Sequence, residues 1–347
     1  MQRTPLFIKE MSCQTVSCNV NELTIFTLNM TEFDFIRQFL QKQQAEGLVL
    51  GIGDDAAIIR PSIGFDLCFS SDMLIKDKHF FSDVSPEDLA WKMLAVNISD
   101  MAAMGAVPKW VLLSAGLPDL DEKWLTRFCE SFFSLAQRFG ITLIGGDTTK
   151  GDLVFNITIV GELPQGQALR RDAAQEGDDI WVSGQIGMAA AALNHRLKNC
   201  SLPPKVFGLC EDKLLRPEPR VDLGLALLPL AHAAQDISDG LAQDLGHILT
   251  ASSLGAEISK DVLPVPDELR TSLSEEQWTA FALSGGDDYE LVFTASADHR
   301  SEILAAAAQC SVAVTRIGKT NNSGRLKIKD KKGGELLLTS RGFDHFG

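Results

Sequence analysis

The sequence predicts an α/β protein of the α+β type with two domains. Its 347 residues are enough for two domains of ordinary size. A content of 45% hydrophobic and 22% charged residues is typical of a globular enzyme with a large core. Strand-like and helix-like segments alternate up to residue 163, and the alternation restarts after Pro164-Gln165-Gly166. We therefore expect domains at residues 30–166 and 167–347, preceded by a disordered extension at residues 1–29, where no periodicity is visible.

The first domain is expected to begin with a helix at residues 31–46, where apolar residues recur at helical spacing. Short apolar or alternating runs predict strands at 55–60 and 66–75. The cap and proline of S-P-E-D at 85–88 predict a helix that ends at Gly105. Beyond it the pattern predicts strands at 110–116, 141–145 and 153–163, and an amphipathic helix at 121–139.

The second domain repeats the alternation of strands and helices. Strands are predicted at 179–183, 233–237, 289–294, 312–318 and 326–329. Helices are predicted at 186–198, 240–253 and 301–309, with one more ending near residue 231.

Six short acidic clusters lie at the expected ends of these strands and helices. They are G-I-G-D-D at 51–55, S-S-D at 70–72, N-I-S-D at 97–100, G-G-D-T-T at 145–149, D-I-S-D-G at 236–240 and S-G-G-D-D-Y-E at 284–290. Any one of them would be interpreted as a turn or a helix cap, because Asp, Ser, Asn and Gly are favoured there. Six of them, in a chain without the cysteine or histidine spacing of a zinc site, favour a phosphate site built on several Mg²⁺ ions.

Two of these clusters allow a second interpretation. Asn97 and Asp100 share one face of an otherwise apolar helix, where a buried hydrogen-bond network would satisfy them as well as a metal ion. G-G-D-T-T-K at 145–150 could bring glycine amides close to a phosphate while Asp147 holds a cation, or could be a turn between two strands.

Familiar nucleotide-binding motifs do not account for the pattern. G-I-G-D-D-A at 51–56 matches the dinucleotide fingerprint formally, but that motif needs a helix directly after it, and here a short apolar run is stopped by Pro61. The phosphate-binding loop of the Walker type and the protein-kinase signatures are absent from the sequence. An ATP-using enzyme with this sequence must belong to another class.

Charge and cysteine content narrow the partners and the compartment. A formal net charge of −14 gives no overall attraction for nucleic acid or for an anionic membrane surface. The seven cysteines are odd in number and form no C-x-x-C pair, which fits reduced thiols. No stretch has the apolar length of a membrane span, and the first residues lack the order of a secretory signal. We expect a cytoplasmic protein without nucleic-acid or membrane partners.

Taken in order, the clusters resemble those of the thiamine-monophosphate kinases, a family in the ATP-dependent superfamily that includes aminoimidazole ribonucleotide synthetase and selenophosphate synthetase. The resemblance runs from about Thr31 to Phe346 and rests on G-I-G-D-D-A, S-S-D, H-F, N-I-S-D-M-A-A-M-G-A, I-G-G-D-T-T, D-I-S-D-G-L, S-G-G-D-D-Y-E-L and the terminal G-F-D-H-F. It implies the two-domain fold of that superfamily and a homodimer whose N-terminal domains pair their sheets. It also implies transfer of the γ-phosphate of ATP to thiamine monophosphate, which gives thiamine diphosphate and ADP.

The resemblance further implies roles for individual residues. Mg²⁺ would be bound by Asp55, Ser70, Ser71, Asp72, Asp100, Asp147, Asp236 and Asp239, and ATP would contact Gly146, Asp147, Arg171 and Ser238. Thiamine monophosphate would contact His79, Asp287 and Phe343, with Asp287 facing the cationic thiazolium and Phe343 stacking on an aromatic ring. Without the matching blocks, Arg171 would be interpreted as a surface arginine and His79 as a solvated histidine. Relatives often carry glutamate at position 287, so the aspartate here is one methylene shorter.

The implied chemistry needs positioning rather than a general base. The attacking phosphate oxygen is already ionised at neutral pH, so we expect Asp72, Asp100 and Asp147 to support transfer through bound Mg²⁺. Two alternatives stay open: another ATP-dependent synthetase of the superfamily, and a non-catalytic sensor of nucleotide or Mg²⁺. A selenophosphate synthetase would carry a reactive cysteine near the start of the matching region, whereas Cys13 and Cys18 precede that region.

Overall fold

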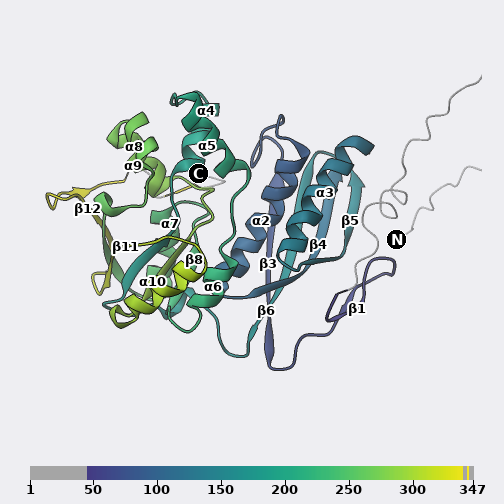
Figure 1. The fold of residues 1–347 in the computed structure, drawn as a ribbon, viewed down its shortest axis with the longest axis horizontal. Helices are drawn as coiled ribbons and strands as arrows, with labels where there is room; N and C mark the ends of the chain where they lie inside the picture. Colours follow the sequence, from purple (N-terminus) through teal and green to yellow (C-terminus); the bar gives the residue numbers. More distant parts are fainter. Residues whose placement is uncertain (1–44, 339–341, 344–347) are drawn as a thin grey trace, which may run out of the picture.

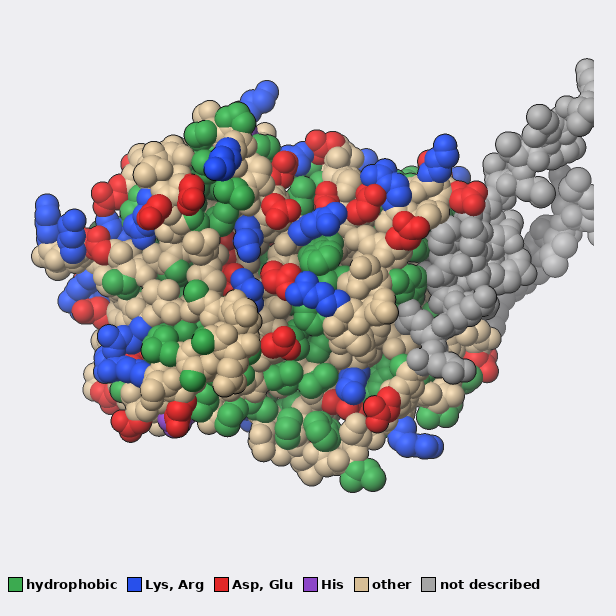
Figure 2. Space-filling view, in the orientation of Figure 1, with side chains coloured by type: hydrophobic (Ala, Val, Ile, Leu, Met, Phe, Trp, Pro, Cys, Tyr) green, Lys and Arg blue, Asp and Glu red, His purple; other side chains and the backbone are tan. Residues whose placement is uncertain are grey.

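The computed structural model describes residues 45–338 and 342–343. These residues form two lobes, each built on its own sheet, with helix α2 (Pro86–Met104) near the boundary between them (Figure 1). The extension expected at residues 1–29 and nearly all of the helix expected at residues 31–46 lie outside the described residues. Within the described ranges, no helix is long and apolar enough to cross a bilayer. Figure 2 shows acidic and basic side chains intermixed on this face of the molecule.

The first lobe is a four-stranded sheet in the order β3-β6-β4-β5, with two helices packed on one face (Figure 1). Its strands are β3 (Phe65–Ile75), β4 (Val107–Leu117), β5 (Thr142–Lys150) and β6 (Val154–Pro164), and its helices are α2 and α3 (Glu122–Arg138). Strand β6 pairs antiparallel with β3 and β4, whereas β5 runs parallel to β4. A short hairpin of β1 (Leu48–Leu50) and β2 (Ile58–Ile59) packs beside Trp110 of the sheet.

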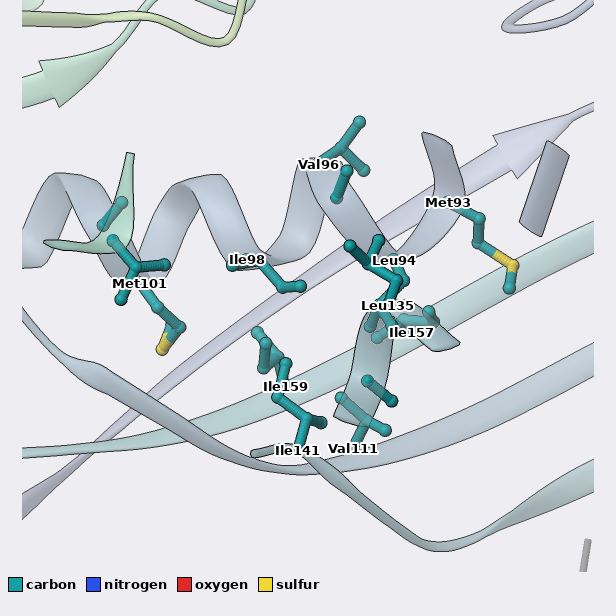
Figure 3. Close-up of a cluster of buried hydrophobic side chains, with 14 of the residues drawn as sticks. Met93, Leu94, Val96, Ile98, Met101, Val111, Leu135, Ile141, Ile157 and Ile159 are labelled. Carbon is teal, nitrogen blue, oxygen red and sulfur yellow. The ribbon is translucent and has the colours of Figure 1, made fainter. Parts of the chain in front are cut away.

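Local signals and core packing both define helix α2. The Ser85 hydroxyl caps its first turn by accepting the N–H of Asp88 at 3.1 Å, and Pro86 opens the helix. The helix ends at Gly105, whose φ of 71° lies in the left-handed region that favours glycine. The buried side chains of α2 that pack over the sheet and α3 in Figure 3 include Met93, Leu94, Ile98 and Met101, opposite Val111, Leu135, Ile141, Ile157 and Ile159.

The second lobe is a seven-stranded sheet in the order β13-β12-β9-β11-β7-β10-β8, antiparallel except between β12 and β9. Its strands are β7 (Asp179–Ser183), β8 (Ala233–Asp236), β9 (Gly255–Ser259), β10 (Leu291–Ala295), β11 (Val314–Asn321), β12 (Leu326–Lys329) and β13 (Glu335–Leu336). Its helices are α4 (Met188–Arg196), α5 (Pro204–Leu215), α6 (Val221–Leu227), α7 (Leu241–Ala251), α8 (Asp267–Ser272), α9 (Glu275–Ser284) and α10 (Arg300–Gln309). One apolar core includes residues of both lobes, so the lobes pack tightly against each other.

Most predicted elements are present, but some strands differ in extent and several elements were missed. The strand expected at 141–145 continues to Lys150, so G-G-D-T-T-K lies within β5 and not in a turn. The strand expected at 55–60 is reduced to β2, and no helix follows G-I-G-D-D-A, which confirms that the dinucleotide motif fails there. The prediction also missed α5, α8, α9 and β9, although Ser274 and Gln277 form a capping box at the start of α9.

Candidate functional site at the junction of the lobes

Carboxylates from both lobes meet around helix α2. On the side of α2 toward β3, Asp100 accepts the hydroxyl of Ser70 at 2.5 Å. On its side toward β8, the buried hydroxyl of Ser99 donates to Asp236 at 2.8 Å. Helix α2 therefore links an acidic strand of the first lobe to the end of a strand in the second.

The amide of Asn97 belongs to a buried hydrogen-bond network. Its Oδ1 accepts the backbone N–H of Asp72 at 3.1 Å, and its Nδ2 donates to the carbonyl of Met93 at 3.0 Å. The hydrogen-bond alternative therefore accounts for Asn97 in full. Because this network uses the backbone of Asp72, it leaves the carboxylate of that residue for another role.

Four of the predicted ligands form what we call the acidic cluster: Asp72, Asp100, Asp236 and Asp239. Burial, followed by the negative charges of Asp100 and Asp239, raises the pKa of Asp72 to about 7. Burial also raises the pKa of Asp100, against the hydrogen bond that it accepts and the positive charge of Arg171. The pKa of Asp236 is raised well above its usual value by burial and then by the charge of Asp100. These carboxylates repel one another when all are ionised.

The loop that carries Asp239 is fixed by a second buried carboxylate. Asp244 Oδ2 accepts the N–H groups of Asp239 at 3.1 Å and Gly240 at 3.0 Å, and its Oδ1 accepts the amide of Gln235 at 2.7 Å. These three bonds hold the backbone at the start of α7, so the position of Asp239 is set before any ligand binds.

The loop between α9 and β10 brings a cation into the site. Asp287 and Tyr289 have φ values of 68° and 50°, a conformation that is uncommon outside glycine. Their N–H groups donate to the carbonyls of Ser238 at 2.8 Å and Ile237 at 2.9 Å. Asp287 Oδ1 lies 3.1 Å from Nζ of Lys92 in α2 and accepts the hydroxyl of Tyr289 at 3.3 Å. In this structure the cation that Asp287 faces is therefore Lys92.

Gly146 and Asp147 lie in β5. Gly146 has a φ of 152°, and a Cβ at this position would lie 1.8 Å from the carbonyl oxygen of Leu113 in β4. The close approach of the two strands alone thus requires glycine. Asp147 is exposed directly after it.

Besides the exposed Asp147, two predicted ligands are not brought to the acidic cluster. Ser71 points to the opposite face of β3 from Ser70, because successive strand residues alternate, and its hydroxyl donates to the carbonyl of Ile157 at 3.0 Å. Asp55 is exposed between β1 and β2, where its N–H donates to Asp54 Oδ1 at 2.9 Å.

The remaining predicted contacts surround the site. Nδ1 of His79 accepts the N–H of Ile75 at 3.1 Å, just beyond β3. Arg171 is exposed, but its charge reaches Asp100, unlike a purely solvated arginine. The N–H of Phe343 donates to the carbonyl of Asp239 at 3.1 Å, which ties the C-terminal segment to the acidic cluster.

The acidic cluster fits Mg²⁺ in the kind of donor that it offers. Carboxylate oxygens are the preferred ligands of this ion, and buried carboxylates of raised pKa are relieved by a cation. Among residues 45–338 and 342–343, none of the four forms an ion pair with lysine or arginine. No three carboxylate, histidine or cysteine side chains in that part of the chain are grouped tightly enough to hold an ion.

The chain is similar to known proteins over most of its length. The family models for the N-terminal and C-terminal domains of AIR synthase related proteins match residues 53–163 and 175–331. The thiamine-monophosphate kinase of Haemophilus influenzae is 40% identical over 324 residues, which cover 91% of this chain and 98% of that protein. The chain belongs to the thiamine-monophosphate kinase family.

Solved structures support the same relationship. A crystal structure of the thiamine-monophosphate kinase from Stenotrophomonas maltophilia matches with a TM-score of 0.78 and 44% identity, over 84% of this chain and 92% of that one. A structure of AaThiL complexed with AMPPCP and TMP matches with a TM-score of 0.72 and 28% identity over the same shares. Membership of the family confirms the predicted AIR synthase fold; the pairing of sheets in a dimer stays a prediction.

Sequence reasoning missed four residues that shape this family member's site: Lys92, Ser99, Asp244 and Tyr289. A signal existed for Lys92 and Ser99, since they are polar, lie seven residues apart in an apolar helix, and so share one face two turns apart. The signal for Tyr289 was its place in the motif S-G-G-D-D-Y-E, since it is the single tyrosine of the sequence. Asp244 carried no such mark, because an aspartate in the first turn of a helix is ordinary.

Proposed function

We propose that the protein phosphorylates thiamine monophosphate, transferring the γ-phosphate of ATP to the substrate's phosphate and releasing thiamine diphosphate and ADP. One observation carries the proposal. A relationship to kinases of that name, covering 91% of the chain, coincides with a cluster of buried and half-buried carboxylates that form no ion pair with lysine or arginine among the described residues. A relative of 28% identity solved with AMPPCP and TMP supports the pair of substrates.

Mg²⁺ is the cofactor that the acidic cluster suits. Asp72, Asp100, Asp236 and Asp239, with Ser70 beside Asp100, would have to move closer together than in this structure to hold several ions. Bound Mg²⁺ supplies positive charge that lets two polyanions approach and stabilises charge on the transferred phosphoryl group. The exposed residues Asp55 and Asp147, and Ser71 on the far face of β3, are weaker candidates as ligands.

The protein's own residues bind and orient the reactants. No side chain needs to remove a proton, because the acceptor phosphate is already ionised at neutral pH. We assign contacts with ATP to Gly146, Asp147, Arg171 and Ser238, and contacts with thiamine monophosphate to His79, Asp287 and Phe343. Positioning is supported by Ser99, which holds Asp236.

A homodimer is also part of the proposal. Strand β3 lies at the edge of its sheet, and its outer face exposes Phe65, Phe69, Met73 and Ile75. An exposed edge strand with an apolar face favours pairing with another chain. Phe69, 62% exposed, is the best site for a test. We expect sedimentation to give a dimer for the unmodified protein and a monomer for Phe69→Glu.

The decisive experiment is a turnover assay. Purified protein with MgATP and thiamine monophosphate should form thiamine diphosphate and ADP, and ADP formation should depend on the acceptor. ADP release with a different phosphate acceptor would favour another synthetase of the superfamily. Binding of ATP and Mg²⁺ in calorimetry without turnover would favour the sensor. The cytoplasmic location stays a prediction from the cysteine pattern.

A further inference from the structure

The acidic cluster does not explain Lys92. This lysine lies in the middle of α2, only 4% exposed, with its Nζ 3.1 Å from Asp287 Oδ1. Burial of an ammonium group is unfavourable unless the charge is paired. An apolar residue would fill the same place in the helix at lower cost, so the charge itself calls for an explanation.

Lys92 stands at the margin of the acidic cluster. It precedes Ser99 by two helical turns, about 10 Å along the axis, and Ser99 binds Asp236. Tyr289 links the two positions: its hydroxyl donates to Asp287 at 3.3 Å, and its N–H donates at 2.9 Å to the carbonyl of Ile237, the residue after Asp236. Its pKa is raised by burial and then by the charges of Asp287 and members of the acidic cluster. A ligand bound at Lys92 would thus adjoin any cation held by that cluster.

The surroundings of Lys92 belong to the acceptor side of the site. The consecutive residues Ser238 and Asp239 accept, through their carbonyls, the N–H groups of Asp287 at 2.8 Å and Phe343 at 3.1 Å. The two residues assigned to thiamine monophosphate are therefore anchored side by side, and Lys92 contacts one of them. Of the residues assigned to ATP, Ser238 borders this region through its bond with Asp287, whereas Gly146 and Arg171 lie on other elements, β5 and the 3-10 turn Arg171–Ala173.

We propose that Lys92 binds the phosphate of thiamine monophosphate, and that Asp287 holds the ammonium in place until the substrate arrives. The inference rests on the proposed function. An ammonium has three donors, so contact with Asp287 leaves capacity for a second anion. A phosphate dianion carries more charge than one carboxylate and competes well for it. Asp287 then keeps the hydrogen bond from Tyr289, so it positions Lys92 in addition to its proposed contact with thiamine monophosphate.

Paired binding measurements test this assignment. Calorimetry with Mg²⁺ and a non-hydrolysable ATP analogue would compare thiamine monophosphate with thiamine, which lacks the phosphate. For Lys92→Met we expect affinity for thiamine monophosphate to fall roughly ten- to a hundredfold, with affinity for thiamine unchanged. KM for thiamine monophosphate should rise while KM for ATP stays the same. Lys109→Met is the matched control. Lys109 lies in β4 and its Nζ pairs with Glu162 of β6 at 3.9 Å, so this variant also removes a lysine from an ion pair with a carboxylate.

Two further variants keep the test independent of folding. Lys92→Arg retains the charge and should keep the preference for the phosphorylated ligand. Asp287→Asn removes a proposed contact with the thiazolium, so it should weaken both ligands to a similar extent and keep the preference for the phosphorylated ligand. A preference that disappears in Asp287→Asn but persists in Lys92→Met would overturn the proposal. So would a Lys92→Met variant that weakens both ligands equally or neither. An unmodified protein that makes no thiamine diphosphate would overturn the proposed function itself.

Discussion

Asp179 and Asp236 are both buried in the second lobe's sheet, but they lie toward opposite ends of its strands. Strand β10 shows this, because its Ala295 pairs with Asp179 and its Leu291 pairs with Asp236. Asp236 is surrounded by other carboxylates and accepts the hydroxyl of Ser99. Asp179 is surrounded by cations. Arg300 donates to both of its carboxylate oxygens, through Nε and, at 2.9 Å, through Nη2. Arg316 Nη1 lies 3.6 Å and Lys319 Nζ 3.8 Å from Oδ1 of Asp179.

The two carboxyls respond to burial in opposite ways. Burial raises the pKa of Asp179, but the hydrogen bond and charge of Arg300, with the other two cations, lower it by more. At Asp236 burial and the charge of Asp100 both raise the pKa, and the bond from Ser99 offsets little of this. The protein thus neutralises one buried acid with its own side chains and leaves the other for an external cation. This difference distinguishes a structural acid from a candidate ligand-binding acid.

The largest expected effect follows from removing a charge of the acidic cluster. Asp72→Asn should lower turnover by roughly 10²- to 10³-fold or more, because a carboxylate that would hold Mg²⁺ is lost. The free energy of unfolding should stay equal or rise, since repulsion from Asp100 and Asp239 disappears. Turnover and urea denaturation would be measured together.

The control for Asp72→Asn is Asp66→Asn in the same strand. Asp66 is exposed and accepts the N–H of Gly166 at 2.9 Å, away from the acidic cluster. The Asp66→Asn variant should keep nearly normal turnover. Near-normal turnover in Asp72→Asn as well would refute the role of that carboxylate.

Removing the carboxylate of Asp179, the structural acid, should have the opposite effects: lower stability and unchanged turnover. Asp179→Asn leaves three partly exposed cations around a buried neutral amide, so we expect a loss of about 2–3 kcal/mol in the free energy of unfolding. Turnover per folded molecule should be unchanged, because the site lies at the other end of the sheet. Urea denaturation at pH 7 measures the first quantity and an assay of folded protein the second. A loss of turnover without a loss of stability would show that Asp179 has a functional role.

The sequence contained part of this comparison. Periodicity predicted the two α/β lobes, and the acidic clusters at the ends of strands and helices predicted a metal site. The family resemblance named Asp72, Asp100 and Asp236 among its ligands. Strand alternation could also have separated Ser71 from its neighbours, since only every second residue faces α2. The cation partners could not be predicted, because Arg300 reaches Asp179 from a helix more than a hundred residues later, and only the fold brings them together. The same holds for Lys92 and Asp287.

The pH dependence of stability should sharpen the comparison. The pKa of Asp72 is raised from 3.8 to about 7 in the folded protein, so the folded state binds more protons than the unfolded state between these values. The contribution of Asp72 to the stability of the metal-free protein should therefore be greatest below pH 4 and fall as pH rises toward 7. The full pKa shift corresponds to about 4 kcal/mol, and because Asp72 is only half-buried, solvent screening reduces the expected loss to on the order of 2 kcal/mol.

Denaturation in a chelator from pH 4 to 8 measures this loss. The Asp72→Asn variant should show a flatter profile, and added Mg²⁺ should restore stability at pH 7.5 in the unmodified protein. An unchanged profile in the variant would mean that other groups cause the loss. Asp179 contributes in the opposite sense, because its lowered pKa gives stability that is lost only as pH falls below the usual range of a carboxyl.

The smallest effect is expected from a single cation around Asp179. Arg316 is nearly half exposed and its Nη1 is 3.6 Å from Asp179, so solvent screens the pair, and Arg316→Met should cost less than about 1 kcal/mol in urea denaturation. Lys329→Met, which removes the surface pair with Glu257 at 2.7 Å, is the matched control and should cost as little. Arg300 still binds both oxygens of Asp179 in the variant, so the carboxylate stays neutralised.

A loss of stability in Arg316→Met near that of Asp179→Asn would mean that the three cations act as a unit. The structural acid would then depend on a complete set of charges, as the acidic cluster is proposed to depend on Mg²⁺.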